Sequence, residues 1–202
     1  MQASLLLPSF IRIFESDFGM VSTIYSIGHG NKPIGEFLEE LAGFGIAYLV
    51  DVRSRPYSKW NPDFNQEPLR RVLKEHGIVY GFMGDALGGV PADRSFYDAE
   101  GRIEYETLKK SSVFMEGLER IYKAASQQCK TVLMCSETDP AQCHRSKLIG
   151  AALLDRYRVS VNHIVARDRC KIQEEVMAEV TRGASVIDLF GNPVALTSKK
   201  IY

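Results

Sequence analysis

Short apolar runs rich in β-branched residues alternate along the chain with longer segments in which apolar positions recur at helical spacing. The short runs predict strands near residues 23–27, 46–52, 78–82, 130–135 and 159–165, with a further short one at 186–189. The longer segments predict helices near 33–43, 66–76, 112–127, 140–156 and 171–181. Such alternation is typical of a mostly parallel sheet. The pattern therefore predicts an α/β fold: a single domain with an open sheet flanked by helices in a Rossmann-like, three-layer arrangement.

The ends of the pattern set the expected domain boundaries. The first strand begins near Thr23, shortly after Met20, so we expect residues 1–19 to be an extension and residues 20–202 to form the domain. The segment 83–105 contains paired glycines and shows neither strand nor helix periodicity. A loop of this length is either a binding loop or a plain insertion, and the sequence leaves both open.

Composition narrows the classes of partner. Lysine plus arginine equals aspartate plus glutamate at 25 each, so no overall charge favours nucleic acid or an acidic membrane, although a local contact with nucleic acid stays open. The four cysteines are too few and too irregularly spaced for a secreted disulfide framework, and we expect them to be reduced in a cytoplasmic protein. No apolar run reaches the roughly 18 residues of a membrane-spanning helix, so we expect no membrane partner.

Two polar stretches directly follow predicted strands. In SIGHGN, glycines flank His29, and Asn31 ends the stretch. In DVRSRPYSKW, Arg53 and Arg55 lie two residues apart and Ser58 follows. Two close guanidinium groups suit a bound anion. An ordinary glycine turn would equally explain the first stretch, and a solvated basic loop would equally explain the second.

The most specific stretch is TVLMCSETDPAQCHRS, which follows the fourth predicted strand. Asp139 is a good N-cap and Pro140 suits the first helical position, so we expect one helix from 140 to 156 with Cys143, His144 and Arg145 in its opening turns. A helix N-terminus stabilises anions and lowers the pKa of a nearby thiol.

These clusters all follow the carboxyl ends of predicted strands, where open parallel sheets bind their ligands. We therefore expect one pocket for a small anionic ligand. The expected catalytic residues are Glu137, His29, Cys135, Cys143 and His144, and the expected substrate-binding residues are Arg53, Arg55, Arg145, Asn31 and Ser58.

The same stretches resemble the conserved blocks of an uncharacterised family, domain of unknown function 488. The matching pieces are SIGHGN, LVDVRSRPYSK, GIVYGFMGDALGG and LMCSETDPAQCHRS, followed by VNHI, over about residues 23 to 165. Family members commonly place a basic residue after the double glycine, where this chain has Val90 and Pro91. The resemblance implies an α/β fold with a shared site, and it implies no activity.

Several functions fit these residues. We prefer an enzyme in which Glu137 is the general base or nucleophile, in a hydrolysis or group transfer on a small phosphorylated or nucleotide-like molecule held by arginines, with a histidine moving a proton. The alternatives are a cysteine-dependent enzyme similar to sulfurtransferases or phosphatases, and a non-catalytic module that binds a nucleotide or nucleic acid.

A metal site is a further alternative, because Cys135, Cys143, His144 and His29 include good soft and borderline ligands. We nevertheless expect no metal, for two reasons, and we expect no cofactor. Cys-x₇-Cys-His is not a standard zinc spacing. In addition, the adjacent Cys143 and His144 would diverge on a helix.

Overall fold

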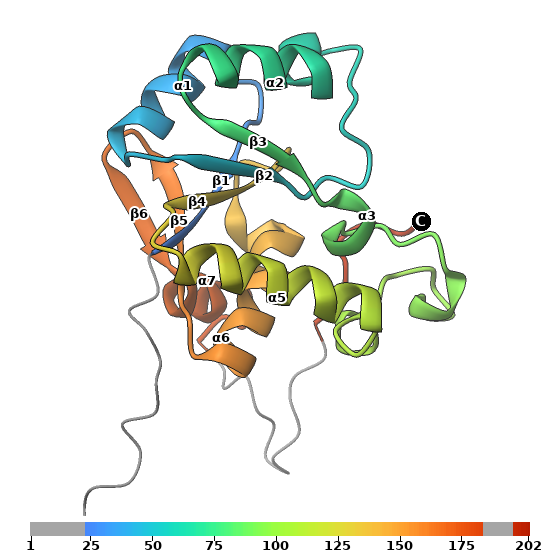
Figure 1. Ribbon diagram of the computed structural model, residues 1–202. Coiled ribbons are helices and arrows are strands. Elements are labelled where there is room, and N and C mark those ends of the chain that lie inside the picture. The colour runs from blue at the N-terminus through green and yellow to red at the C-terminus, as the bar shows by residue number, and fades with distance from the viewer. Residues whose placement is uncertain (1–22, 184–195) are drawn as a thin grey trace, which may run out of the picture.

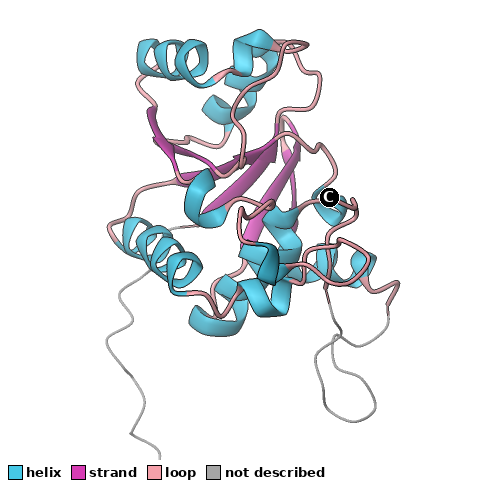
Figure 2. Cartoon of the chain, turned by 90° about the vertical axis from the view of Figure 1, so that its right-hand side faces the viewer, coloured by secondary structure: helices cyan, strands magenta, loops and turns pink. Residues whose placement is uncertain are grey.

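The structure, a computed structural model, describes residues 23–183 and 196–202. It shows one six-stranded sheet between two layers of helices (Figures 1 and 2). The expected extension at 1–19 and the strand expected at 186–189 lie outside the described residues. The predicted α/β three-layer fold is confirmed.

The sheet has the order β3-β2-β4-β1-β5-β6. Its strands are β1 (Ile24–Gly28), β2 (Tyr48–Asp51), β3 (Val79–Phe82), β4 (Thr131–Cys135), β5 (Val161–Ala166) and β6 (Arg169–Ile172). The first five are parallel, and β6 pairs antiparallel with β5. All five residues of the central β4 are buried, which explains its continuous apolar run.

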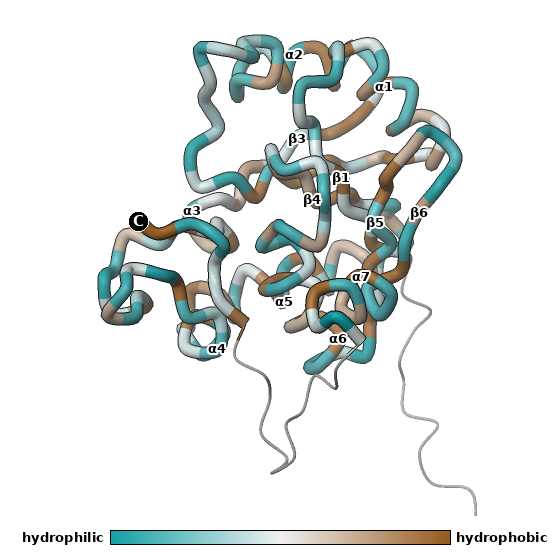
Figure 3. Tube along the Cα trace, turned by 180° about the vertical axis from the view of Figure 1, so that it is seen from behind, coloured by the Kyte–Doolittle hydropathy of each residue, from teal (hydrophilic) through white to brown (hydrophobic). Residues whose placement is uncertain are grey.

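Helices cover both faces of the sheet. They are α1 (Ile34–Gly43), α2 (Gln66–Glu75), α3 (Gly84–Leu87), α4 (Tyr105–Leu108), α5 (Ser112–Ser126), α6 (Ala151–Tyr157) and α7 (Gln173–Val180). In Figure 1, α1 and α2 lie on one side of the strands, and α5, α6 and α7 lie on the other. Hydrophilic and hydrophobic residues alternate along α2 in Figure 3, as expected of a helix with one buried face.

Two hydrophobic cores hold the layers together. One contains Phe37 of α1 and Leu69 of α2 with the β4 residues Val132 and Met134. The other contains residues of α5 and α6 together with Leu133. Successive side chains of β4 therefore enter opposite cores, as the alternation of a strand requires.

Three predictions of local structure are wrong or incomplete. The single helix expected at 140–156 is divided into a 3₁₀ turn at Pro140–Gln142, a π-helix at Arg145–Gly150 and then α6. The helix expected at 171–181 begins two residues later, because the antiparallel strand β6 ends only at Ile172. The segment expected to be a loop at 83–105 contains α3 and a 3₁₀ turn at Arg94–Phe96.

No helix in the described part of the chain is both long and apolar enough to cross a membrane.

Candidate functional site

The carboxyl ends of β1, β2 and β4 lie side by side, because these strands are neighbours in the sheet. Each of the three polar stretches follows one of them. Backbone hydrogen bonds join the strand exits: the N–H of His29 donates to the carbonyl of Cys135 at 3.0 Å, and that of Val52 donates to Met134 at 3.0 Å. The stretches therefore meet at one edge of the sheet.

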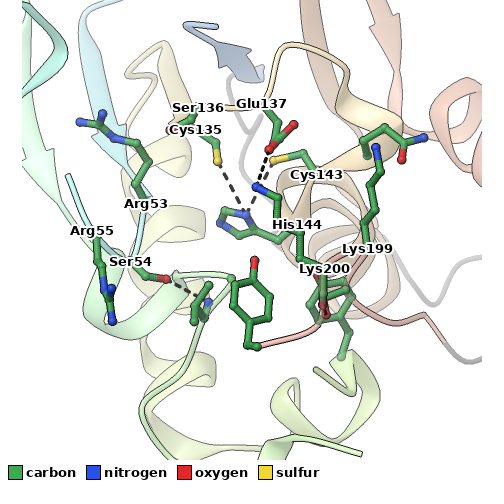
Figure 4. A pocket seen from close by; sticks show the side chains of 16 residues that line it. Arg53, Ser54, Arg55, Cys135, Ser136, Glu137, Cys143, His144, Lys199 and Lys200 are labelled. Atoms are coloured by element: carbon green, nitrogen blue, oxygen red, sulfur yellow. Dashed lines mark hydrogen bonds and ion pairs between the residues drawn. The ribbon is translucent and has the colours of Figure 1, made fainter. Parts of the chain in front are cut away.

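A cavity of about 310 Å³ opens at this edge (Figure 4). This is the size of a site for a small molecule. Its walls include six of the residues expected to be functional: Arg53, Arg55, Cys135, Glu137, Cys143 and His144. The other four expected residues, His29, Asn31, Ser58 and Arg145, are not among the described residues that line it.

Two cysteines and a histidine converge on the floor of the cavity. The Nδ1 atom of His144 lies 3.8 Å from the Sγ of Cys135 and 3.7 Å from the Sγ of Cys143. The three candidate ligand atoms all lie within 4.8 Å of one another. Nε2 of His144 lies 3.0 Å from the carbonyl oxygen of Val52, which can only accept, so Nε2 carries the hydrogen. The lone pair of Nδ1 therefore faces both sulfurs.

The break in the expected helix makes this convergence possible. Asp139 caps the turn as predicted, since its carboxylate accepts a hydrogen bond from the N–H of Ala141 at 2.9 Å. Cys143 then adopts an extended conformation, with φ −114° and ψ 149°. The backbone changes from extended at Cys143 to helical at His144, and in this local geometry Nδ1 of His144 lies 3.7 Å from the Sγ of Cys143.

Arg145 is fully buried beside the cluster. Its Nε donates to the Sγ of Cys143 at 3.3 Å, and its Nη2 donates to the backbone carbonyl of Glu137 at 2.6 Å. No carboxylate of the described residues forms an ion pair with it, so Cys143 is the anion available to balance its charge. Arg145 thus holds Cys143 and the backbone of Glu137 in place, and it is not among the described residues that line the cavity.

The two thiols share their protons unequally. Burial raises the pKa of Cys143, but the hydrogen bond from Cys135 and the positive charge of Arg145 outweigh burial and hold that pKa well below its usual value. The hydrogen bond to Cys143, together with burial, raises the pKa of Cys135. These opposite shifts favour the thiolate form at Cys143 and the protonated form at Cys135.

A buried hydrogen-bond chain holds Arg145 in place. Its Nη1 donates to the Oγ of Ser26 at 3.0 Å, and this hydroxyl lies 2.6 Å from Nδ1 of His163. Nε2 of His163 in turn lies 2.8 Å from Oε1 of Gln173 on α7. Burial lowers the pKa of His163 to about 4, so the ring is neutral and can accept at Nδ1 while donating at Nε2. This hydrogen-bond chain was not predicted, because isolated polar residues in strands and helices form no recognisable sequence pattern.

Arg53 is held by the protein rather than free for a ligand. Its guanidinium makes a two-pronged contact with the buried Asp51, at 2.9 and 2.6 Å, and also donates to the carbonyl of Phe64 at 2.7 Å. Tyr80 donates to the same carboxylate at 2.8 Å, and burial followed by the charge of Asp51 raises the pKa of Tyr80. Figure 4 shows the guanidinium of Arg53 directed away from His144.

Of the remaining expected residues, His29 and Ser58 have partners near them in the fold, and Asn31 is exposed. His29 stacks on Phe64 at 4.3 Å between ring centroids, and burial followed by the charge of Arg53 lowers its pKa to about 4. The hydroxyl of Ser58 accepts backbone hydrogen bonds within its own loop, and Asn31 is exposed.

The rim of the cavity is basic. Arg55, Lys199 and Lys200 line it, and all three are exposed. Glu137 is the one acidic side chain among the described lining residues, and it lies 3.5 Å from the ammonium group of Lys200. The cavity therefore offers an excess of positive charge above the cysteines.

Sequence reasoning missed part of the wall. Ser198, Lys199, Lys200 and Tyr202 line the cavity, and no motif or period marked them. Gly89, Val90 and Tyr105 also line it, and they lie in the segment 83–105 that was left open as a binding loop. The double glycine was a usable signal: a Cβ on Gly89 would lie 2.7 Å from Cγ of His144, so the chain needs glycine there to pass over the ring.

Comparison with known proteins gives one match. A search of curated proteins and a search of solved structures each found no match. The model of the family described as domain of unknown function DUF488 matches residues 33–152, which is more than half of the chain and includes most of the cavity wall. The chain therefore belongs to the DUF488 family.

Proposed function

We propose that the protein is an enzyme that carries out hydrolysis or group transfer on a small anionic molecule, phosphorylated or nucleotide-like, in the strand-end cavity. The observation that carries the proposal is the combination of a basic rim with a buried Cys-Cys-His floor. Arg55 and Lys199 have no ion-pair partner among the described residues, so an anion can bind them without displacing a carboxylate. Charge-assisted contacts to phosphate oxygens are stronger than neutral ones.

Glu137 is the proposed general base. Its backbone is fixed, because its carbonyl accepts from Arg145, while its carboxylate is half-exposed at the cavity. A general base must reach the substrate. The fixed main chain of Glu137 positions the residue, and its half-exposed side chain is free to make that contact. A bound anion competing for Lys200 would release the carboxylate from its 3.5 Å contact.

Binding is tested with inorganic phosphate, pyrophosphate and adenosine monophosphate by isothermal titration calorimetry. We expect Arg55→Ala and Lys199→Ala each to weaken binding about tenfold, which is the loss of about 1.4 kcal/mol. Lys74→Ala is the matched control. Lys74 is an exposed cation in the last turn of α2, which leads into the amino end of β3, whereas the cavity lies at the carboxyl ends of the strands. Equal affinities in all three variants would refute the basic rim as the binding surface.

Turnover is tested on a panel of phosphate monoesters, phosphodiesters and nucleotides. We expect Glu137→Gln to keep ligand affinity and to remove turnover, because the amide keeps the shape and loses the basicity. An active Glu137→Gln variant would contradict the role of Glu137. Ligand binding without any turnover across the panel would favour the non-catalytic alternative.

One observation favours a second candidate, a cysteine-dependent transferase. The contact of 3.3 Å from Arg145 Nε to Cys143 Sγ places a thiolate in the cavity wall, which is the arrangement of an activated nucleophile. This candidate predicts that Cys143→Ser abolishes turnover while Glu137→Gln stays active, the reverse of the first proposal for Glu137.

A further inference from the structure

We propose that Cys135, Cys143 and His144 bind a zinc ion that keeps one coordination position open to the cavity. This inference goes beyond the proposed function, because metal binding rests on the geometry of the three side chains alone. Only the part that the metal would play in catalysis rests on the proposed function.

The distances between the three side chains fit a tetrahedral zinc centre. With Zn–S bonds of about 2.3 Å and Zn–N bonds of about 2.05 Å, tetrahedral angles place a nitrogen and a sulfur about 3.6 Å apart and two sulfurs about 3.8 Å apart. The two observed nitrogen–sulfur distances are 3.8 and 3.7 Å, and all three atoms lie within 4.8 Å of one another. The nitrogen–sulfur distances already match, and the two sulfurs would approach each other by up to about 1 Å to complete the coordination.

The histidine has the tautomer that a ligand needs. The N–H at Nε2 of His144 points to the carbonyl of Val52 at 3.0 Å, which leaves the lone pair of Nδ1 between the sulfurs. Metal-bound histidines usually donate their other N–H to a carbonyl or carboxylate in this way. Gly89 lies against the face of the ring and leaves it no room to turn, since even a Cβ there would lie 2.7 Å from Cγ.

Donors that stabilise thiolates surround the sulfurs. The Sγ of Cys143 accepts from the backbone N–H of Arg145 at 3.5 Å and from its Nε at 3.3 Å. The backbone N–H of Glu137 also donates to Cys135. A pair of metal-bound thiolates needs such hydrogen bonds, and the two negative charges would balance the charge of the ion. Two thiolates and one imidazole form a borderline-soft set that suits zinc better than magnesium or calcium.

Three protein ligands are the mark of a catalytic zinc rather than a structural one, which has four. All three line the cavity, so the fourth position would face the substrate. In the reaction of the proposed function, a zinc-bound water would give its proton to Glu137, and the resulting hydroxide would form a bond to phosphorus. As the bond from phosphorus to the leaving oxygen breaks, Glu137 would return the proton to that oxygen.

The sequence-based objection to a metal assumed that Cys143 and His144 lie on one continuous helix and diverge. In the structure the backbone changes from extended at Cys143 to helical at His144, and the two side chains come within 3.7 Å of each other. The unusual spacing of seven residues between the cysteines follows from the loop and the 3₁₀ turn that bring the chain back over the end of β4. The expectation of no metal is therefore replaced by this proposal.

The test measures metal in the full-length protein. We expect protein purified without chelator to contain one zinc per chain by inductively coupled plasma mass spectrometry. We expect Cys135→Ser, Cys143→Ser and His144→Ala to lose it. Cys170→Ser is the matched control and should retain the zinc, because Cys170 lies on β6 at the edge of the sheet, outside the cavity wall.

A second measurement avoids variants that fail to fold. Zinc is removed from the wild-type protein with a chelator and replaced by cobalt(II). We expect intense visible bands of tetrahedral cobalt and a thiolate-to-cobalt charge-transfer band. A folded wild-type protein without zinc that also gives no such bands would overturn the proposal, as would zinc retained in all three ligand variants. Both readouts are independent of turnover, so a metal-loaded but inactive protein counts against the proposed function alone.

Discussion

Replacing Gly28 by alanine should destabilise the loop that carries the site. A Cβ at this position would lie 1.9 Å from the carbonyl oxygen of Glu137 and 2.9 Å from the Cα of Thr138, both backbone atoms. The loop must therefore move away from β1. We expect about 1 to 3 kcal/mol from overpacking, and about 1 kcal/mol for each hydrogen bond that the movement breaks. The bonds at risk are the 2.6 Å contact from Arg145 to Glu137 and the 3.0 Å contact from Gly30 N–H to the carbonyl of Ser136.

The expected total is a loss of about 3 to 5 kcal/mol in the free energy of unfolding, measured by urea denaturation. Gly35→Ala is the matched control, because a Cβ there meets nothing within 4 Å and the residue lies in α1. That variant should be unchanged or up to about 1 kcal/mol more stable. Surface substitutions usually change the free energy of unfolding by no more than about 0.5 kcal/mol. If Gly28→Ala differs from the wild type by no more than this, the close approach of loop and strand is not what fixes the site.

Two further predictions concern buried charge. The pKa of His163 is about 4 in the fold against 6.5 in the unfolded chain, so the unfolded chain binds a proton that the fold rejects. The contribution of His163 to stability is fully present above pH 6.5 and falls by up to about 3 kcal/mol as the pH drops to 4. Between pH 8 and pH 4, the free energy of unfolding of His163→Gln, measured by urea denaturation, should fall by correspondingly less than that of the wild type. Equal losses in the two proteins would contradict the assignment. Asp51→Asn should cost about 3 to 5 kcal/mol, because it leaves the guanidinium of Arg53 buried without a carboxylate. Tyr80→Phe, which removes one neutral donor to Asp51, should cost about 1 kcal/mol, and an equal cost for both variants would show that the charge pair is not decisive.

Much of the fold follows from local pattern. Every strand of the parallel part of the sheet begins and ends within two residues of its prediction, because buried parallel strands are short apolar runs between turn signals. The edge strand β6 was missed, since the polar–apolar alternation of RCKI covers only four residues and the strand forms by pairing with β5.

The site was predicted less well, for a physical reason. The capping signals at Asp139 and Pro140 correctly start a turn, but they cannot say how long the helix continues. The contacts of His144 with Val52 and of Arg145 with Ser26 are tertiary, and they hold both side chains where the chain is extended at 143. The sequence also could not show which protein groups hold Arg53 and Arg145. The guanidinium of Arg53 contacts Asp51 and the carbonyl of Phe64, and that of Arg145 contacts the distant Ser26. A role of either arginine in substrate binding stays a prediction.

The π-helix at Arg145–Gly150 makes the site depend on the number of residues as well as on their identity. A π turn holds more residues than an α turn, so deleting a single residue between 146 and 150 would let the segment close into an ordinary α-helix. Everything before the deletion would then rotate by about 100° relative to α6. If α6 keeps its place in the core, Arg145 would turn away from the hydroxyl of Ser26 on β1, which its Nη1 contacts at 3.0 Å, although no functional side chain had been altered. Substitution scans would not detect this dependence, whereas a one-residue deletion paired with a one-residue insertion would reveal it directly.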